Sequence, residues 1–264
     1  MLIIITVLLS WGIRALPEDV VHSIPGVSKL GYGAIDPRTI ISFYGQMSTT
    51  SLVLIANIAQ PILSFLYFSY NGLFTAMLLG FEWVSYAVHR KGLRVSRLPE
   101  GAQRSTYFLQ LPYRFALPLM ALSGVLHWLV SQSIFLVAID TYNWDGSTDI
   151  YGDWKSCGYS PIAIFTTLML GILMTLSAVG VGWVPFKPGM NLAGSCSAAI
   201  SAACHGLDES DAHGYEKAIS KLQWGVAGTN ADGIGHCTFS TKEVEMPKVG
   251  QMYAGIKTGR SNTR

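Results

Sequence analysis

Residues 39–81 read TIISFYGQMSTTSLVLIANIAQPILSFLYFSYNGLFTAMLLGF, a run that contains no Asp, Glu, Lys or Arg. Two further runs, 115–139 and 156–186, also lack these four residue types. A helix needs about 20 apolar residues to cross the roughly 30 Å hydrocarbon core of a bilayer, and each run is longer than that. The three runs therefore predict helices that cross a membrane.

The rest of the chain fits this prediction. Of its 264 residues 50% are hydrophobic and 13% are charged, a balance that one soluble core does not absorb. We expect an all-α integral membrane protein with about four transmembrane helices and a partly ordered C-terminal tail. The expected spans are about 2–15, 55–86, 115–139 and 161–184, within a transmembrane region over 1–185 and a tail over 186–264.

The first two spans are the least well defined. Residues 2–9 are apolar but lack a basic flank and a cleavage site, so they predict a short or truncated span rather than a signal peptide. Residues 39–60 leave three arrangements open: a long helix bent near Pro61, a helix that follows a re-entrant or interfacial segment, or two full spans. The polar stretch Ser42–Thr50 disfavours two full spans.

The loops on either side of the third span differ in charge. The loop over residues 89–114 contains the cations Arg90, Lys91, Arg94, Arg97, Arg104 and Arg114 and the single acid Glu100. The next loop contains four aspartates and one lysine. Since Lys and Arg accumulate in cytoplasmic loops, we expect the basic loop, the tail and both termini in the cytoplasm, in the plasma membrane or an endomembrane. The formal net charge of +2 gives no reason to expect nucleic acid as a partner.

The basic loop has two interpretations. Its charges are explained by orientation alone, but Arg90, Lys91, Arg94, Arg97 and Arg104 are also suited to bind anionic lipids of the cytoplasmic leaflet. Glu82, within the end of the second span, is expected to pair with Arg90 or Arg114; the alternative is a gating or coupling carboxylate.

Polar residues recur at helical spacing on two of the expected spans. Their spacing places each set on one face of its helix, and the sets are Asn57, Gln60, Ser64, Tyr67 and Asn71 on the second span and Ser123, His127 and Ser131 on the third. The favoured interpretation is hydrogen bonding between helices. The alternative is a binding site or solvated path, in which His127 accepts a proton.

The tail contains ligands that suit a metal but lacks a metal-site motif. Cys196, Cys204, His205, His236 and Cys237 are soft donors, yet no C-x-x-C or H-x-x-x-H pair is present. Packing cysteines are the favoured interpretation, with a zinc site or acylation of Cys196 or Cys204 as alternatives. No phosphate-binding loop, calcium loop or hydrolase motif occurs, so the sequence predicts no cofactor and no enzymatic activity.

Several long strings resemble one protein family. They include ANIAQPILSFLYFSYNGLFTAMLLGFEW at 56–83, SGVLHWLVSQSIFLVAID at 123–140, LAGSCSAAISAACH at 192–205 and GHCTFS at 235–240. Residues from about 11 to 255 are similar to the C-terminal half of a group of fungal multi-pass membrane proteins, known by a domain of unknown function placed upstream of this region. The resemblance implies a fungal integral membrane protein and assigns no functional residue. Because members of the family are longer, it leaves two alternatives for this chain: a shortened gene model or a shorter paralogue.

Two functions remain open from the sequence. The first is a non-enzymatic membrane protein whose cytoplasmic face recruits or regulates partners. The second is a transporter or channel subunit that uses the polar stripes. Because four helices leave little room for a path within one chain, the second function requires a homo-oligomer or further helices.

Overall fold

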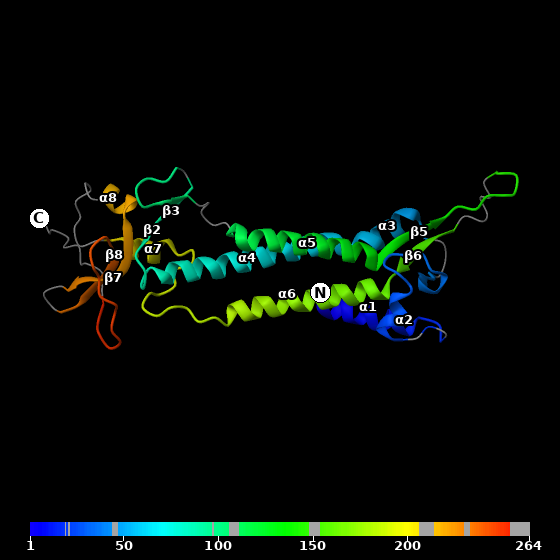
Figure 1. Cartoon of the computed structure of the whole chain (residues 1–264), viewed down its shortest axis with the longest axis horizontal. Coiled ribbons are helices and arrows are strands. Elements are labelled where there is room, and N and C mark those ends of the chain that lie inside the picture. The colour runs from blue at the N-terminus through cyan, green and yellow to red at the C-terminus, as the bar shows by residue number, and fades with distance from the viewer. Residues whose placement is uncertain are drawn as a thin grey trace, which may run out of the picture. The chain divides into compact units, whose positions relative to one another are not determined.

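The chain folds into two compact units. The computed structural model describes residues 1–18, 20, 22–43, 47–96, 98–105, 111–147, 154–205, 214–229 and 233–253. Unit 1 consists of Met1–Asn71 and Pro112–Val181, and unit 2 of Gly72–Leu111 and Gly182–Arg264. The division falls within helix α4 (Ala59–Ser85), which is continuous across it (Figure 1).

Unit 1 is built mainly from helices. Besides the first part of α4 they are α1 (Leu2–Arg14), α2 (Ile24–Ser28), α3 (Thr49–Asn57), α5 (Tyr113–Ser133), α6 (Pro161–Gly182) and the short 3₁₀ helix η1 (Pro37–Thr39). Leu63, Leu126 and Val130 form a buried cluster that joins α4 and α5, and Leu170 and Met174 of α6 pack against it.

The long apolar run contains a break at Ile58, between α3 and α4. Pro61 explains the break, because a proline ring clashes with the carbonyl four residues earlier, here that of Asn57, and provides no N–H to bond it. Ser48 caps α3 by accepting a hydrogen bond from the Ser51 N–H at 3.2 Å. The arrangement corresponds to the expected bent helix, but the helical segment begins at Thr49 instead of 55.

A three-stranded antiparallel sheet completes unit 1. Its strand order is β1 (Ile40–Ile41), β6 (Trp154–Tyr159) and β5 (Ile134–Ile139). Strands β5 and β6 form a hairpin whose register pairs Ile134 with Tyr159 and Ile139 with Trp154. The Tyr159 hydroxyl donates to the Gly12 carbonyl at 2.8 Å, which attaches the sheet to α1.

Unit 2 combines the end of α4 with the basic loop and the tail. Its elements are β2 (Lys91–Gly92), β3 (Arg94–Val95), β4 (Arg104–Ser105), α7 (Ser197–Cys204), α8 (Gly214–Ile219), β7 (Lys221–Thr229) and β8 (Gly235–Ser240). The sheet order β2-β7-β8 places a strand of the basic loop beside the tail hairpin. Tyr86, Met190, Ala203, Leu222 and Phe239 belong to its buried core.

The expected all-α fold is wrong, because both units contain β-sheet and the protein is of mixed α and β structure. The expected third span, 115–139, is divided between helix α5 and strand β5. The sequence IFLVAI at 134–139 is apolar and rich in β-branched residues, and such a run gives no periodicity that separates a buried helix from a strand.

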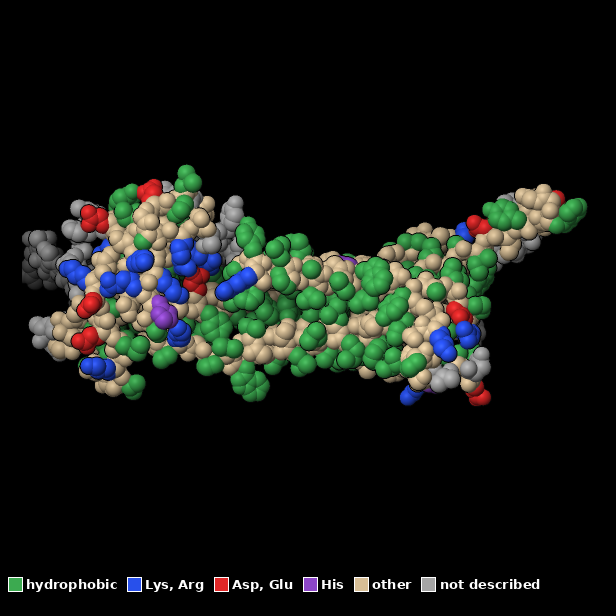
Figure 2. Space-filling view, in the orientation of Figure 1, with side chains coloured by type: hydrophobic (Ala, Val, Ile, Leu, Met, Phe, Trp, Pro, Cys, Tyr) green, Lys and Arg blue, Asp and Glu red, His purple; other side chains and the backbone are tan. Residues whose placement is uncertain are grey.

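Among the described residues, three helical segments are long and apolar enough to cross a membrane: Thr49–Ser85, Tyr113–Ser133 and Pro161–Gly182. Helix α1 is apolar and has 13 residues, which agrees with the short segment expected at 2–15 but is fewer than the roughly 20 residues that a full crossing needs. Hydrophobic side chains cover the visible surface of the long helices, whereas Lys and Arg gather over unit 2 (Figure 2). Phe65 is 71% exposed and Leu173 61%, and an apolar surface of this kind is typical of membrane contact.

Candidate functional site

The polar stripes on α4 and α5 meet at one pair, Gln60 and His127. The amide Nε2 of Gln60 donates to the His127 carbonyl at 3.2 Å, and the amide Oε1 lies 2.6 Å from His127 Nδ1. Because the amide oxygen only accepts, Nδ1 carries the proton in neutral His127, and Nε2 is left as an acceptor. Both side chains are partly buried.

Three of the other stripe residues donate hydrogen bonds within the helices that bear them. Asn57 donates to the Val53 carbonyl at 2.9 Å, Ser64 to that of Gln60 at 3.2 Å, and Ser131 to that of Trp128 at 2.7 Å. Tyr67 stacks in a tilted arrangement on Phe68, while Ser123 and Asn71 are partly buried. The Gln60–His127 pair is therefore a contact between helices that the stripes provide in addition to apolar packing.

A second contact between helices involves Tyr70, which the stripe pattern missed. Its hydroxyl lies 2.9 Å from the Met174 carbonyl and 2.7 Å from Ser177 Oγ on α6. Tyr70 stands one residue before Asn71, the last residue of the stripe on α4. Extending the stripe to neighbouring polar residues would have found it.

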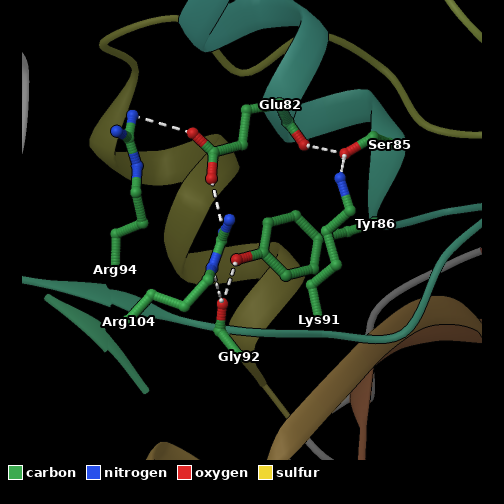
Figure 3. Close-up of polar contacts among 7 residues, drawn as sticks. All are labelled: Glu82, Ser85, Tyr86, Lys91, Gly92, Arg94 and Arg104. Carbon is green, nitrogen blue, oxygen red and sulfur yellow. Dashed lines mark hydrogen bonds and ion pairs between the residues drawn. The ribbon is translucent and has the colours of Figure 1, made fainter. Parts of the chain in front are cut away.

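A polar network of charged groups lies at the end of α4, where Glu82 pairs with two arginines of the basic loop (Figure 3). The carboxylate lies 2.7 Å from Arg94 Nη2 and 2.6 Å from Arg104 Nη2. Strands β3 and β4 pair in parallel with Arg94 opposite Arg104, which brings both guanidinium groups to one carboxylate. Arg94 has only 11% of its side chain exposed, so this ion pair is largely shielded from water.

Gly92 is the backbone centre of the same network. Its carbonyl accepts hydrogen bonds from the Tyr86 hydroxyl at 3.0 Å and from Arg104 Nε at 3.1 Å (Figure 3). A Cβ at Gly92 would overlap the backbone carbonyl of Ala102. Glycine at this position thus allows two segments of the basic loop to lie against each other.

Two lysines lie beside this network. Lys91 Nζ donates to Ser85 Oγ at 2.7 Å, and Lys187, just after α6, lies 2.6 Å from His89 Nε2. Burial lowers the pKa of Lys91, and the charges of Arg104 and Lys187 lower it further, against the opposing effect of Glu82. Lys187 was not among the predicted lipid-binding residues, because it is distant from the basic loop in sequence.

The remaining loop arginines have other contacts. Arg90 donates to the Lys242 carbonyl at 2.8 Å, and Arg114 lies over the Phe115 ring at 4.8 Å. The prediction that Glu82 pairs with Arg90 or Arg114 is therefore wrong, although its partners do come from the same loop. Arg97 lies outside the described residues.

An aromatic core joins α4 to the tail. The Phe239 ring on β8 lies 5.4 Å from that of Tyr86 and 5.5 Å from that of Trp83, both in edge-on arrangements. Trp83 Nε1 donates to the Asn191 carbonyl at 3.0 Å. The basic loop and the tail are thus packed on the same end of α4.

The candidate metal ligands have other roles in the described part of the chain, where no three His, Cys, Asp or Glu side chains are grouped to hold a metal. His205 Nδ1 lies 2.8 Å from the Ser201 carbonyl, and His236 Nε2 lies 2.9 Å from that of His205. Cys196 and Cys204 are exposed near the two ends of α7. Burial raises the pKa of the Cys237 thiol, which disfavours the thiolate that a metal would bind.

Comparison with known proteins identifies a family but no activity. No curated protein and no solved structure matches the chain. One family matches residues 1–234, and its description is "Domain of unknown function (DUF8419)". The expected resemblance placed such a domain upstream, whereas this match lies within the chain. The chain therefore belongs to the family defined by the domain of unknown function DUF8419.

Proposed function

We propose that this protein is a multi-pass integral membrane protein whose cytoplasmic unit recruits or regulates partners, without enzymatic activity. The observation that carries the proposal is the joining of the basic loop to the tail: β2 pairs with β7, and Glu82 holds Arg94 and Arg104. A loop whose only role is to orient the spans would not need to pair with a strand of the tail. The proposed setting is a fungal plasma membrane or endomembrane, in line with the resemblance of the long strings.

The orientation rests on charge. The cations of the basic loop lie between α4 and α5, which favours the cytoplasm for unit 2. The hairpin β5–β6 connects α5 to α6. In the proposed orientation this hairpin lies on the side of the membrane opposite to unit 2. Three spans are sufficient for this arrangement, and the side on which α1 lies does not alter it.

A second candidate function is a transporter or channel subunit, which with three long spans requires a homo-oligomer. The observation in its favour is the Gln60–His127 pair, which leaves His127 Nε2 as a proton acceptor between two spans. Hydrogen bonding of this kind also holds helices together, so the pair by itself does not favour transport over packing.

Two variants of the full chain separate these functions. Gly92→Ala disturbs unit 2, and the double variant Gln60→Leu/His127→Leu removes the polar pair between spans. We expect proteins that co-purify with the tagged wild-type chain to be lost with Gly92→Ala and retained with the double variant. Proton or solute flux in reconstituted vesicles that disappears only in the double variant would replace the first function by the second.

A further inference from the structure

Positive charge at the end of α4 exceeds what Glu82 neutralises. Lys91 bonds to Ser85 and Lys187 to His89, and the His89 N–H donates to the Ser85 carbonyl at 2.9 Å, so both ammonium groups are held by one turn of chain. Glu82 is already bonded to two arginines. In this group one carboxylate, that of Glu82, thus stands against the cations Arg94, Arg104, Lys91 and Lys187, and the electrostatic repulsion between the cations favours an added anion.

The two ammonium groups keep bonding capacity for such an anion. A lysine ammonium has three N–H donors. Within the described residues the structure gives Lys91 Nζ one bond, to Ser85 Oγ, and Lys187 Nζ one bond, to His89 Nε2. Lys187 is exposed and Lys91 partly buried, so the pair is accessible to a ligand while its position is set by the fold.

The positions of Lys91 and Lys187 along the chain favour a lipid headgroup as the anion. Lys91 follows the end of α4 at Ser85, and Lys187 follows the end of α6 at Gly182, each by a few residues. Phe186 packs on Gly80, with 3.1 Å from its Cε1 to a Cβ built at that glycine, so the segment with Lys187 is held against α4. If both helices cross the membrane, these lysines lie at the depth of the lipid headgroups.

We propose that Lys91 and Lys187 bind the phosphate of an anionic lipid headgroup in the cytoplasmic leaflet. The proposal rests on the membrane orientation given above and names a ligand for the cytoplasmic unit. Arg94 and Arg104, which the sequence suggested as lipid ligands, serve mainly to hold the loop on Glu82. The site therefore includes a residue from beyond the basic loop.

The test measures binding of short-chain phosphatidic acid to the full chain in neutral detergent, with short-chain phosphatidylcholine and inorganic phosphate as comparison probes. We expect Lys91→Gln/Lys187→Gln to weaken phosphatidic acid binding roughly thirtyfold, as the loss of two near-surface cations implies. Lys221→Gln/Lys242→Gln is the matched control, since it removes the same charge from exposed lysines of unit 2, and it should leave the affinity within about twofold. Lys91→Arg/Lys187→Arg should restore most of the binding.

Three results would overturn the inference. Equal weakening by both glutamine double variants would mean that only total charge matters. Inorganic phosphate bound as tightly as the lipid would make the ligand a soluble anion. If the wild-type chain did not bind phosphatidic acid, the lipid site would be disproved. The proposed function would still stand if other proteins continued to co-purify with the chain.

Discussion

At the residue scale, Glu82 is the acidic residue that pairs with two arginines of unit 2. Its carboxylate lies at the end of an apolar helix and satisfies two guanidinium groups, of which Arg94 is only 11% exposed. Taking a cation out of water is costly unless a counter-charge accompanies it. Glu82 thus allows the basic loop to fold against α4 instead of extending into solvent.

Glu82→Gln should destabilise unit 2 by about 2–4 kcal/mol, because it leaves a shielded arginine without its carboxylate. The measurement is the unfolding midpoint of the full chain in detergent, followed by tryptophan fluorescence. Glu245→Gln is the matched control, since Glu245 is 80% exposed and lies 3.7 Å from Lys248. That control should change stability by less than about 0.5 kcal/mol, and an equal effect of both variants would disprove the role of Glu82.

The pair Gln60 and His127 allows a second test at this scale. Gln60→Leu or His127→Leu alone leaves one polar partner unsatisfied and should cost about 1 kcal/mol, whereas the double leucine variant should cost less than the sum. Asn57→Leu is the control, because its amide bonds to Val53 of the same helix. Unfolding in mixed detergents gives the coupling free energy, and strictly additive effects would show that the two side chains act independently.

At the element scale, the sequence predicted the helices better than the strands. Long uncharged runs predict α4, α5 and α6 because a long apolar helix leaves a direct trace in composition. Strand β5 has no such trace: Ile134–Ile139 continues the apolar run, and its hydrogen bonds go to β6, which is distant in sequence. The partners of Glu82 were missed for the same reason, since the register of β3 and β4 is set by folding.

Gly92, in β2, lies closely against Ala102 of the same loop. Gly92→Ala should open the loop, because the added methyl would overlap the Ala102 carbonyl, a backbone atom that no rotamer change can move. We expect trypsin to cleave the basic loop roughly tenfold faster, since cleavage follows the population of the open form. Gly214→Ala is the control, as a Cβ there meets nothing within 4 Å. Unchanged cleavage in Gly92→Ala would mean that β2 does not depend on this close approach.

At the scale of the whole molecule, the proposed arrangement requires that the two loop regions at opposite ends of the long helices face opposite sides of a membrane. The cysteines suit a test of this requirement. Cys157 is fully buried and should not react in the folded protein, whereas Cys196 and Cys204 are exposed in unit 2. Trp144, in the turn between β5 and β6, is 100% exposed and provides a reporter position for the other side.

Trp144→Cys should therefore be labelled by a membrane-impermeant maleimide in sealed cells or right-side-out vesicles, while Cys196 and Cys204 should react only after the membrane is permeabilised. The wild-type chain is the control, because its buried Cys157 should add no signal from the hairpin side. Labelling of the tail cysteines in sealed membranes would reverse the orientation and place the basic loop outside, against its charge. Equal labelling of both regions before permeabilisation would show that the long helices do not separate them, and the lipid site proposed at Lys91 and Lys187 would lose its physical basis.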